Sequence, residues 1–284
     1  SFFAEDICNI GDNFFSLYNI DTIVNFAAQT HVDRSIKDPK AFLETDIMRT
    51  FNLAYQSIKY GKIKKFVHIS TDEVYGPIFV DGNEFASLNP TSPYSASKAA
   101  ADLLLLSYHK TYGLPVIILR PCNNFGPRQY PEKLIPVTVM RILNGLPPIV
   151  HGLGQEVREW IYVQDCVDII LKVVLEDKLK PGEILNIGEP YNRYKNIDII
   201  SMIVSYMNFM TPLQYVSNRP GNDASYAIDS SKCRQLFQTA DNHGILYNLN
   251  RTIDWYVENG KDWWWRNQLD LNANVYEKGE GYLR

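Results

Sequence analysis

The segment Lys64-Lys65-Phe66-Val67-His68-Ile69-Ser70 decides the fold, because it reads as a short buried strand that runs directly into the polar residues Thr71-Asp72-Glu73. A second run of this kind covers residues 21–28 and ends in two alanines, and a third covers residues 116–119. Near-continuous apolar runs of this length are typical of strands that are covered on both faces.

Helical patterns separate these strands. Apolar residues recur at helix spacing over residues 39–60. A long helix rich in Ala and Leu is expected over residues 94–112, with Gly113 where a helix stop belongs. The alternation of strand and helix predicts an α/β fold with a doubly wound parallel sheet.

The chain changes character after about Arg120, because Pro and Gly become frequent and the alternation loosens. In this part we expect helices over residues 165–176, 196–206 and 248–265, and strands over 184–187 and 214–216. We predict that residues 1–120 form the sheet domain, to which the chain returns around 155–170. Residues 121–284 would form mainly a smaller α/β lobe that binds the substrate.

The composition is that of an ordinary globular chain, with 284 residues, 45% apolar and 21% charged, and a formal net charge of -4. This mild acidity gives no electrostatic reason to expect nucleic acid or a membrane surface as a partner. The sequence has no run of about 18 apolar residues and no signal-peptide pattern, so we expect a cytoplasmic protein without a membrane span. The four cysteines are widely spaced and no ligand cluster accompanies His31, so no metal site is predicted.

Tyr94 and Lys98 are four residues apart and therefore lie on one face of the predicted helix. An ammonium beside a phenol stabilises the phenolate, which lowers the pKa of the tyrosine towards the range where it can act as a base. The spacing alone is a weak signal, because an exposed tyrosine near a solvated lysine occurs in many helices.

Thr71, Asp72 and Glu73 strengthen this signal, because doubly wound sheets bind ligands at the carboxyl ends of their strands. Taken alone, two adjacent carboxyls after a strand cap a turn as often as they take part in a reaction. With Tyr94 and Lys98 they supply a hydroxyl, two carboxyls and a Tyr/Lys pair to one crevice. Two carboxyls in a dry cleft repel each other as anions, which helps to keep one of them protonated.

Long motifs over essentially the whole chain resemble those of the dTDP-glucose 4,6-dehydratases, which are short-chain dehydrogenase/reductases with a Rossmann-like fold. The matching segments are residues 26–35, 70–76, 94–98, 123–127, 130–136, 157–165, 219–223 and 226–229. The resemblance implies an NAD-dependent lyase of deoxysugar biosynthesis, rhamnose included. Such an enzyme oxidises carbon 4 of dTDP-glucose, eliminates water across carbons 5 and 6, and returns hydride to carbon 6.

The resemblance also implies a role for each catalytic residue. Tyr94 would take the proton of the 4-hydroxyl, and Lys98 would lower its pKa and hold the nicotinamide ribose. Thr71 would hydrogen-bond the 4-oxygen. Glu73 would remove the proton from carbon 5, and protonated Asp72 would donate to the leaving 6-hydroxyl.

Binding residues follow from the same resemblance. Those expected to contact NAD are Asp6, Ile7, Phe26, Ala27, Ala28, Gln29, Thr30, Thr45, Tyr94, Lys98 and Asn124. Those expected to contact the nucleotide-diphosphate hexose are Thr30, Thr71, Asn123, Lys133, Leu134, Ile149, His151, Arg158, Asn186, Asn222 and Tyr226. Arg158 is the main candidate for the diphosphate, because a guanidinium offers two parallel donors to phosphate oxygens.

Two departures from the family pattern leave alternatives open. Asn222, Ala224 and Ser225 stand where the family often has a histidine and two arginines, so the substrate is either dTDP-glucose or UDP-glucose. The Gly-rich turn that opens a dinucleotide-binding sheet has no counterpart, and residues 1–7 read like a third strand. We therefore expect the sequence to lack the first strands of the functional protein.

Other functions remain in competition at this point. One is another nucleotide-sugar enzyme of the superfamily, such as a 4-epimerase or a decarboxylase, and another is a non-catalytic nucleotide-sugar-binding protein. Asp72 and Glu73 favour the dehydratase, because neither rival enzyme needs this pair for an elimination. The resemblance further implies a homodimer that forms through the helices over residues 41–60 and 94–112.

Overall fold

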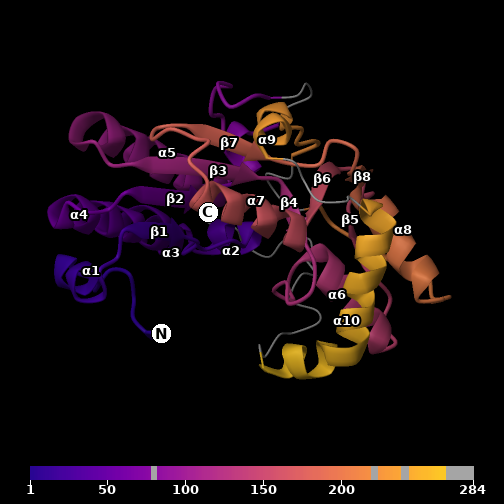
Figure 1. Cartoon of the computed structure of the whole chain (residues 1–284). Helices are drawn as coiled ribbons and strands as arrows, with labels where there is room; N and C mark the ends of the chain where they lie inside the picture. Colours follow the sequence, from indigo (N-terminus) through magenta and orange to yellow (C-terminus); the bar gives the residue numbers. More distant parts are fainter. Residues whose placement is uncertain (78–81, 219–222, 238–242, 267–284) are drawn as a thin grey trace.

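The main sheet has four parallel strands in the order β1 (Thr22–Asn25), β2 (Lys65–Ile69), β3 (Val116–Pro121) and β7 (Ile184–Ile187) (Figure 1). The computed structural model describes residues 1–77, 82–218, 223–237 and 243–266. The centres of β2 and β3 are fully buried, as their apolar runs predict. The expected parallel sheet is confirmed.

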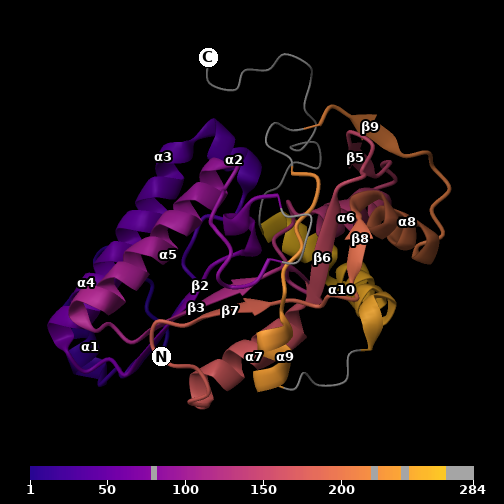
Figure 2. The ribbon, with the colours of Figure 1, turned by 90° about the horizontal axis from the view of Figure 1, so that it is seen from above.

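Helices cover both faces of this sheet (Figure 2). They are α1 (Asp12–Tyr18), α4 (Thr50–Tyr60) and α5 (Pro93–Tyr112) on one face, and α7 (Val163–Leu175) and α9 (Ser231–Leu236) on the other. Phe66 and Ile118 point into the first layer, whereas Val67 and Ile117 point into the second. Successive side chains of a strand face opposite ways, so each strand supplies both cores. This is the predicted doubly wound arrangement.

Helix α5 begins and ends where its sequence signals predict. Ser92 is its N-cap and accepts a hydrogen bond from the backbone N–H of Ser95 at 3.1 Å, and the Ser95 hydroxyl returns a bond to the N-cap backbone. Pro93 occupies the first turn, where its missing N–H costs nothing. Gly113 ends the helix with φ 73°. These caps fix the position of the residues in the first turn of α5.

The helical segment expected over residues 39–60 is present but not uniform. It starts with α3 (Pro39–Phe42), widens to a π-helix over Leu43–Arg49, and continues as α4. The short helix α2 (Val32–Lys37) precedes it. π-helical turns of this kind are often found at functional sites.

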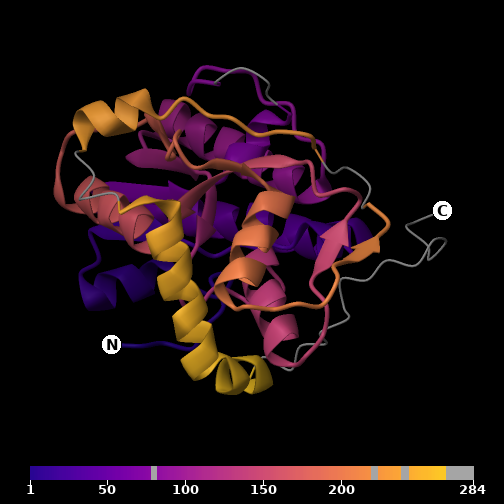
Figure 3. The same ribbon diagram turned by 90° about the vertical axis from the view of Figure 1, so that its right-hand side faces the viewer.

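The chain builds a smaller lobe, which faces the viewer in Figure 3. Its strands form one sheet in the order β4 (Asn123–Phe125), β6 (Val157–Tyr162) and β8 (Arg193–Lys195), and a pair of β5 (Ile149–His151) and β9 (Gln214–Val216). Its helices are α6 (Leu134–Leu143), α8 (Asn196–Tyr206) and α10 (Gly244–Arg266). Side chains such as Ile135, Trp160, Ile199 and Tyr256 form a second core in this lobe.

Two expectations are corrected. Residues 1–7 form no strand: they are mostly exposed, and β1 pairs only with β2 among the described residues. The strand at Ile184–Ile187 belongs to the main sheet beside β3 and not to the smaller lobe. The chain therefore returns to the sheet through both α7 and β7, because the free edge of β3 is completed by this later strand.

Candidate active site

The site lies where the carboxyl ends of β1, β2 and β3 meet, since parallel strands end at the same edge of the sheet. Residues 26–30 follow β1, and the short 3₁₀ helix Asp72–Tyr75 follows β2 after Thr71. Tyr94 and Lys98 enter from the first turns of α5, and Asn123 and Asn124 follow β3. Segments that are far apart in sequence thus deliver their polar side chains to one place.

Thr71, Asp72 and Glu73 form a compact unit at the end of β2. The Thr71 hydroxyl accepts a hydrogen bond from the backbone N–H of Glu73 and donates to Oδ1 of Asp72, both at 3.2 Å. Asp72 is 2% exposed, and its Oδ2 has no hydrogen-bond partner within the described part of the chain. Burial, with Glu73 and Glu159 nearby, raises the pKa of Asp72 to about 8. This carboxyl keeps its proton at neutral pH and is equipped to donate it.

Tyr94 is buried beside this unit. The Thr71 hydroxyl lies beside its phenol, and its ring meets that of Phe42 edge to face at 6.3 Å. Burial raises the pKa of Tyr94 well above its ordinary value, and the nearby charge of Glu73 acts in the same direction. The sequence predicts a lowered pKa, so this expectation is corrected: in this structure desolvation, Glu73, Asp46 and Asp72 all raise the pKa of Tyr94.

Lys98 lies one turn further along α5 and is 2% exposed. Its ammonium donates to the carbonyl oxygen of Ile69 at 2.7 Å, at the end of β2. Burial lowers the pKa of Lys98, while Asp102 and Asp46 oppose this shift. Lys98 is thus held at the carboxyl edge of the sheet by a backbone acceptor, and two buried carboxyls face it.

The segment after β1 is tied to the helices behind it. Asp46, in the π-helical turn, accepts from the backbone N–H of Gln29 at 2.8 Å and from the Ser97 hydroxyl at 2.6 Å. Ser97 precedes Lys98 on α5, so Asp46 connects the β1 loop to the catalytic helix. Thr45 accepts from Arg49 at 2.9 Å, and Arg49 pairs with Asp6 at the same distance.

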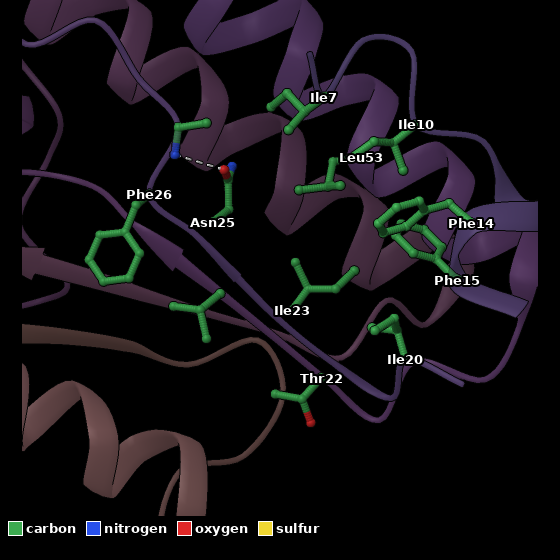
Figure 4. A pocket seen from close by; sticks show the side chains of 12 residues that line it. Ile7, Ile10, Phe14, Phe15, Ile20, Thr22, Ile23, Asn25, Phe26 and Leu53 are labelled. Carbon is green, nitrogen blue, oxygen red and sulfur yellow. Dashed lines mark hydrogen bonds between the residues drawn. The ribbon is translucent and has the colours of Figure 1, made fainter. Parts of the chain in front are cut away.

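A cavity of about 420 Å³ lies along the edge of β1 (Figure 4). Ile7, Asn25, Phe26 and Ala27 line part of it, and the Asn25 side chain accepts from the N–H of Ala27 at 3.1 Å. The Phe26 ring, which directly follows β1, is 59% exposed, which is unusual for a large aromatic residue.

Three of the residues expected to contact NAD, Ile7, Phe26 and Ala27, line this cavity, and their chemistry fits a flat cofactor. Ala27 and Ala28 allow a flat cofactor to approach the backbone, and the Phe26 ring offers an apolar contact. Lys98 supplies a fixed donor at the carboxyl edge of the sheet, where β2 ends. Asn124 lies further along this edge, where its amide donates to the carbonyl of Cys122 at 3.0 Å.

Arg158 on β6 is the best-placed cation of the expected substrate site. It is 5% exposed, and its guanidinium lies 4.5 Å from the centroid of the Tyr226 ring. It donates to the backbone carbonyls of Val157 and Asp223 at 2.8 and 2.9 Å. Stacking and two backbone acceptors hold the guanidinium in one plane, which suits bidentate recognition of an anion.

The other expected substrate residues lie on the lobe side. Lys133 donates to the carbonyl of Thr30 at 2.6 Å and thereby joins the lobe to the β1 loop, and Leu134 follows it at the start of α6. Asn123 is half-buried on β4, next to β6. Ile149 and His151 lie further away on β5, where Ile149 is buried and His151 is half-buried.

Two of the expected substrate residues are not placed in the site. Asn186 is fully buried, and its amide bonds to the Tyr75 hydroxyl, the Gly82 carbonyl and the Asp229 carbonyl at 2.8 to 3.2 Å. It has no exposed surface with which to contact a substrate, so we correct its role to a structural one. Asn222 lies outside the described residues.

A buried polar network beneath the site escaped the sequence reasoning. Asp102 pairs with Arg120 at 2.9 Å and faces His68 at 3.9 Å, and Arg120 donates to the Tyr75 hydroxyl at 2.8 Å. A spacing signal was available, because Asp102 follows Lys98 by four residues and shares its helix face.

Neither a metal cluster nor a membrane span is apparent in residues 1–77, 82–218, 223–237 and 243–266. No group of three or more potential metal ligands occurs among these residues. None of the helices they form is long and apolar enough to cross a membrane.

The fold and the Tyr/Lys pair beside two carboxyls define a nicotinamide-dependent class of enzyme, and comparison with known proteins agrees. The NAD dependent epimerase/dehydratase family matches residues 2–188, and the chain belongs to this family. A dTDP-glucose 4,6-dehydratase of Escherichia coli is 38% identical over 288 residues, which is 89% of this chain and 78% of the relative. One of Neisseria meningitidis is 35% identical over 306 residues, or 99% and 85% of the two chains.

Solved structures lead to the same family. DesIV, a dTDP-glucose 4,6-dehydratase from Streptomyces venezuelae crystallised with NAD, superposes with a TM-score of 0.85 at 36% identity, over 93% of this chain and 81% of that one. A UDP-glucuronic acid 4-epimerase from Bacillus cereus, also with NAD, has a TM-score of 0.86 at 28% identity, over 91% and 82%. The fold is therefore shared by dehydratases and epimerases, and the site must distinguish them.

Proposed function

We propose that this protein is an NAD-dependent dTDP-glucose 4,6-dehydratase. The observation that carries the proposal is the unit of Thr71, Asp72 and Glu73, with Asp72 buried and protonated directly beside Glu73. An elimination of water needs one acid and one base side by side, with their pKa values pushed apart. The relatives from Escherichia coli and Neisseria meningitidis, which bear this name, support the same activity.

In this proposal the residues act in order. Tyr94 takes the proton of the 4-hydroxyl, and Thr71 hydrogen-bonds the same oxygen. Glu73 then removes the proton at carbon 5, which becomes acidic once carbon 4 is a ketone. Asp72 gives its proton to the departing 6-hydroxyl, so that water leaves. NAD, when bound, supplies the hydride acceptor for carbon 4 and the donor for carbon 6. Glu73 would return its proton to carbon 5 as carbon 6 is reduced, and between turnovers Tyr94 releases a proton while Asp72 regains one.

Lys98 has a positioning part in the proposed reaction. Its ammonium is fixed on the Ile69 carbonyl, and it would hold the nicotinamide ribose. The high pKa of Tyr94 means that the phenol holds its proton in the absence of a cation close to it. Bound NAD would supply such a cation through its positively charged nicotinamide ring, and Tyr94 would then release its proton more readily.

The proposed substrate is dTDP-glucose, and UDP-glucose is the alternative. Arg158 would bind the diphosphate, supported by its stacking on Tyr226 and its backbone acceptors. Lys133 and Asn123 would flank the sugar. The similarity to named dTDP-glucose dehydratases at 35–38% identity favours dTDP.

Turnover of three nucleotide sugars tests this proposal. The purified protein with NAD is incubated with dTDP-glucose, UDP-glucose and UDP-glucuronate in parallel, and the products are analysed by mass spectrometry. A dTDP-sugar lighter by one water, with the absorbance of a 4-keto sugar in alkali, is expected. A product of unchanged mass but altered stereochemistry would identify a 4-epimerase and refute the proposal.

We also propose that the protein is a homodimer that pairs through α4 and α5. Large apolar side chains remain exposed on these helices, with Tyr55 at 50%, Leu103 at 58% and Tyr112 at 59%. Apolar patches on such a surface mark association sites. Sedimentation of the protein and of Leu103→Asp tests this: the variant should sediment as a monomer, and a monomeric native protein would contradict the dimer.

A further inference from the structure

Asp223 occupies a junction between the smaller lobe and the catalytic helix. Its carboxylate accepts hydrogen bonds from the hydroxyls of Tyr226 and Thr91 through the same oxygen, Oδ2. Its backbone carbonyl accepts from the guanidinium of Arg158 at 2.9 Å. One residue therefore connects its own loop, which includes Tyr226, to two segments that are remote in sequence, those of Thr91 and Arg158.

The first end of this junction leads to the expected diphosphate site. The backbone N–H of Val157 donates to the carbonyl of Ala224 at 2.9 Å, and that of Tyr226 donates back to the Val157 carbonyl at 3.4 Å. These two hydrogen bonds hold residues 224–226 alongside the start of β6. The ring of Tyr226 then lies under the guanidinium of Arg158, and its hydroxyl is held by Asp223.

The second end leads to the start of α5. Thr91 precedes the N-cap Ser92, whose capping box with Ser95 is closed in both directions. Tyr94 is the second residue of the helix and lies three residues after Thr91. A hydroxyl held at Thr91 thus restrains the backbone that enters the capped turn and, with it, the phenol of Tyr94.

A second contact supports the same connection. The backbone N–H of Gly82 donates to the Ala227 carbonyl at 3.1 Å, and that of Asp229 donates to the Gly82 carbonyl at 2.9 Å. The segment from β2 to α5 is therefore joined to residues 223–229 at two places. Of these two connections, only the one at Asp223 is made by side chains, so a point substitution can remove it.

From this arrangement we infer that Asp223 is a positioning residue that sets the diphosphate-binding guanidinium of Arg158 and the phenol of Tyr94 in register. A substrate of this enzyme class spans both groups, since its sugar is attached to its diphosphate. Binding energy at the diphosphate can assist catalysis at the sugar only if the two groups are held at a fixed separation. This inference rests on the proposed function.

Two single-bond variants separate the ends of the junction. Thr91→Val removes the bond towards Tyr94, and Thr91→Ser keeps the hydroxyl. Tyr226→Phe removes the bond towards Arg158 and keeps the ring beneath the guanidinium. Tyr191→Phe, at a tyrosine that is 85% exposed, is the matched control for loss of a phenol hydroxyl.

The measurements are kcat and KM for dTDP-glucose, Kd for dTDP by calorimetry, and the melting temperature. Thr91→Val should lower kcat by about ten-fold, the size expected for loss of one hydrogen bond to a charged group, with little change in Kd. Thr91→Ser should recover most of that loss. Tyr226→Phe should instead raise Kd and KM several-fold with a smaller effect on kcat, and Tyr191→Phe should match the native protein.

Asp223→Ala should combine both effects, and Asp223→Asn, which keeps one acceptor oxygen, should show part of them. If Asp223→Ala lowers only the melting temperature, the inference is overturned, because its role is then structural alone. It is overturned equally if Thr91→Val and Tyr226→Phe change kcat and Kd in the same proportion. If the native protein does not dehydrate dTDP-glucose, the proposed function fails, whereas the Kd of Tyr226→Phe and Asp223→Ala still decides the Arg158 end.

Discussion

Asp72→Asn is expected to stabilise the protein at neutral and alkaline pH while it removes the acid of the proposed reaction. Asp72 is buried, and its pKa is raised from 3.8 to about 8, chiefly by desolvation and further by Glu73 and Glu159. Between these two pH values the folded state holds a proton that the unfolded chain has released. The contribution of Asp72 to stability is therefore fully present below the unfolded pKa and is lost as the pH rises through 8.

The magnitude follows from the pKa shift. At pH 7 the pH lies about three units above the unfolded pKa, and at about 1.4 kcal/mol per unit the cost is on the order of 4 kcal/mol. Asparagine does not ionise and avoids this cost. Its amide places N–H donors where Oδ2 has no partner among the described residues, and a buried unpaired donor costs about 1–3 kcal/mol. The net gain is about 1–3 kcal/mol at pH 7, and it falls to zero between about pH 4.5 and about pH 6, below which the variant is the less stable protein.

Urea unfolding of the native protein and Asp72→Asn, followed by tryptophan fluorescence at several pH values, measures this effect. The difference in free energy of unfolding should grow by about 3–4 kcal/mol in favour of the variant between pH 5 and pH 8. Asp38→Asn, at an exposed aspartate between α2 and α3, serves as the control and should show no such growth. A difference that is equal at pH 5 and pH 8 would refute the reasoning. Turnover of Asp72→Asn should fall by about 10²–10⁴-fold, as for loss of a general acid.

Three further predictions concern Tyr94, Arg158 and the buried network beneath the site. Tyr94→Phe should lower kcat by about 10²–10⁴-fold with dTDP still bound in calorimetry, because only the proton acceptor is lost; a normal kcat would exclude Tyr94 as the base. Arg158→Met should raise KM for dTDP-glucose by about 10–100-fold in steady-state assays, and an unchanged KM would place the diphosphate elsewhere. Arg120→Met should lower the free energy of unfolding in urea by about 3–5 kcal/mol, since it strands the buried carboxylate of Asp102. The double variant with Asp102→Leu should recover most of that loss, and if it does not, the pair is not what stabilises this region.

The strands and the long helices were accessible from sequence because their signals are local. The strand at Ile184–Ile187 matched its predicted bounds, yet its partner did not, since an apolar run marks a strand without naming its neighbour. The same limit explains why a strand was wrongly predicted over the first seven residues. An apolar start reads like a strand, but a strand exists only where another one can pair with it.

The residues of the candidate site also differ in whether local sequence could place them. Thr71, Asp72 and Glu73 are adjacent in sequence, and Tyr94 and Lys98 share a helix face, so their proximity follows from local geometry. Asn186 was misplaced because its burial under Tyr75 depends on tertiary packing that no spacing reveals.

The direction of the Tyr94 pKa was misjudged for a related reason. Sequence shows which charges are near along a helix, but it does not show how much water burial removes. Asp223 was likewise visible only as part of a motif, because its partners Thr91 and Arg158 are distant in the chain.

The π-helical turn over Leu43–Arg49 has a consequence for how this family can vary. A widened turn accommodates one more residue than an α-helix of the same rise, and one residue corresponds to about 100° of rotation. Deletion of a single residue within the turn would restore a regular helix and leave α4 packed on the sheet. It would also rotate Asp46 away from Gln29 and Ser97, and so separate the β1 loop from the catalytic helix. Insertions and deletions are therefore tolerated far less in these seven residues than their position on an outer helix would indicate.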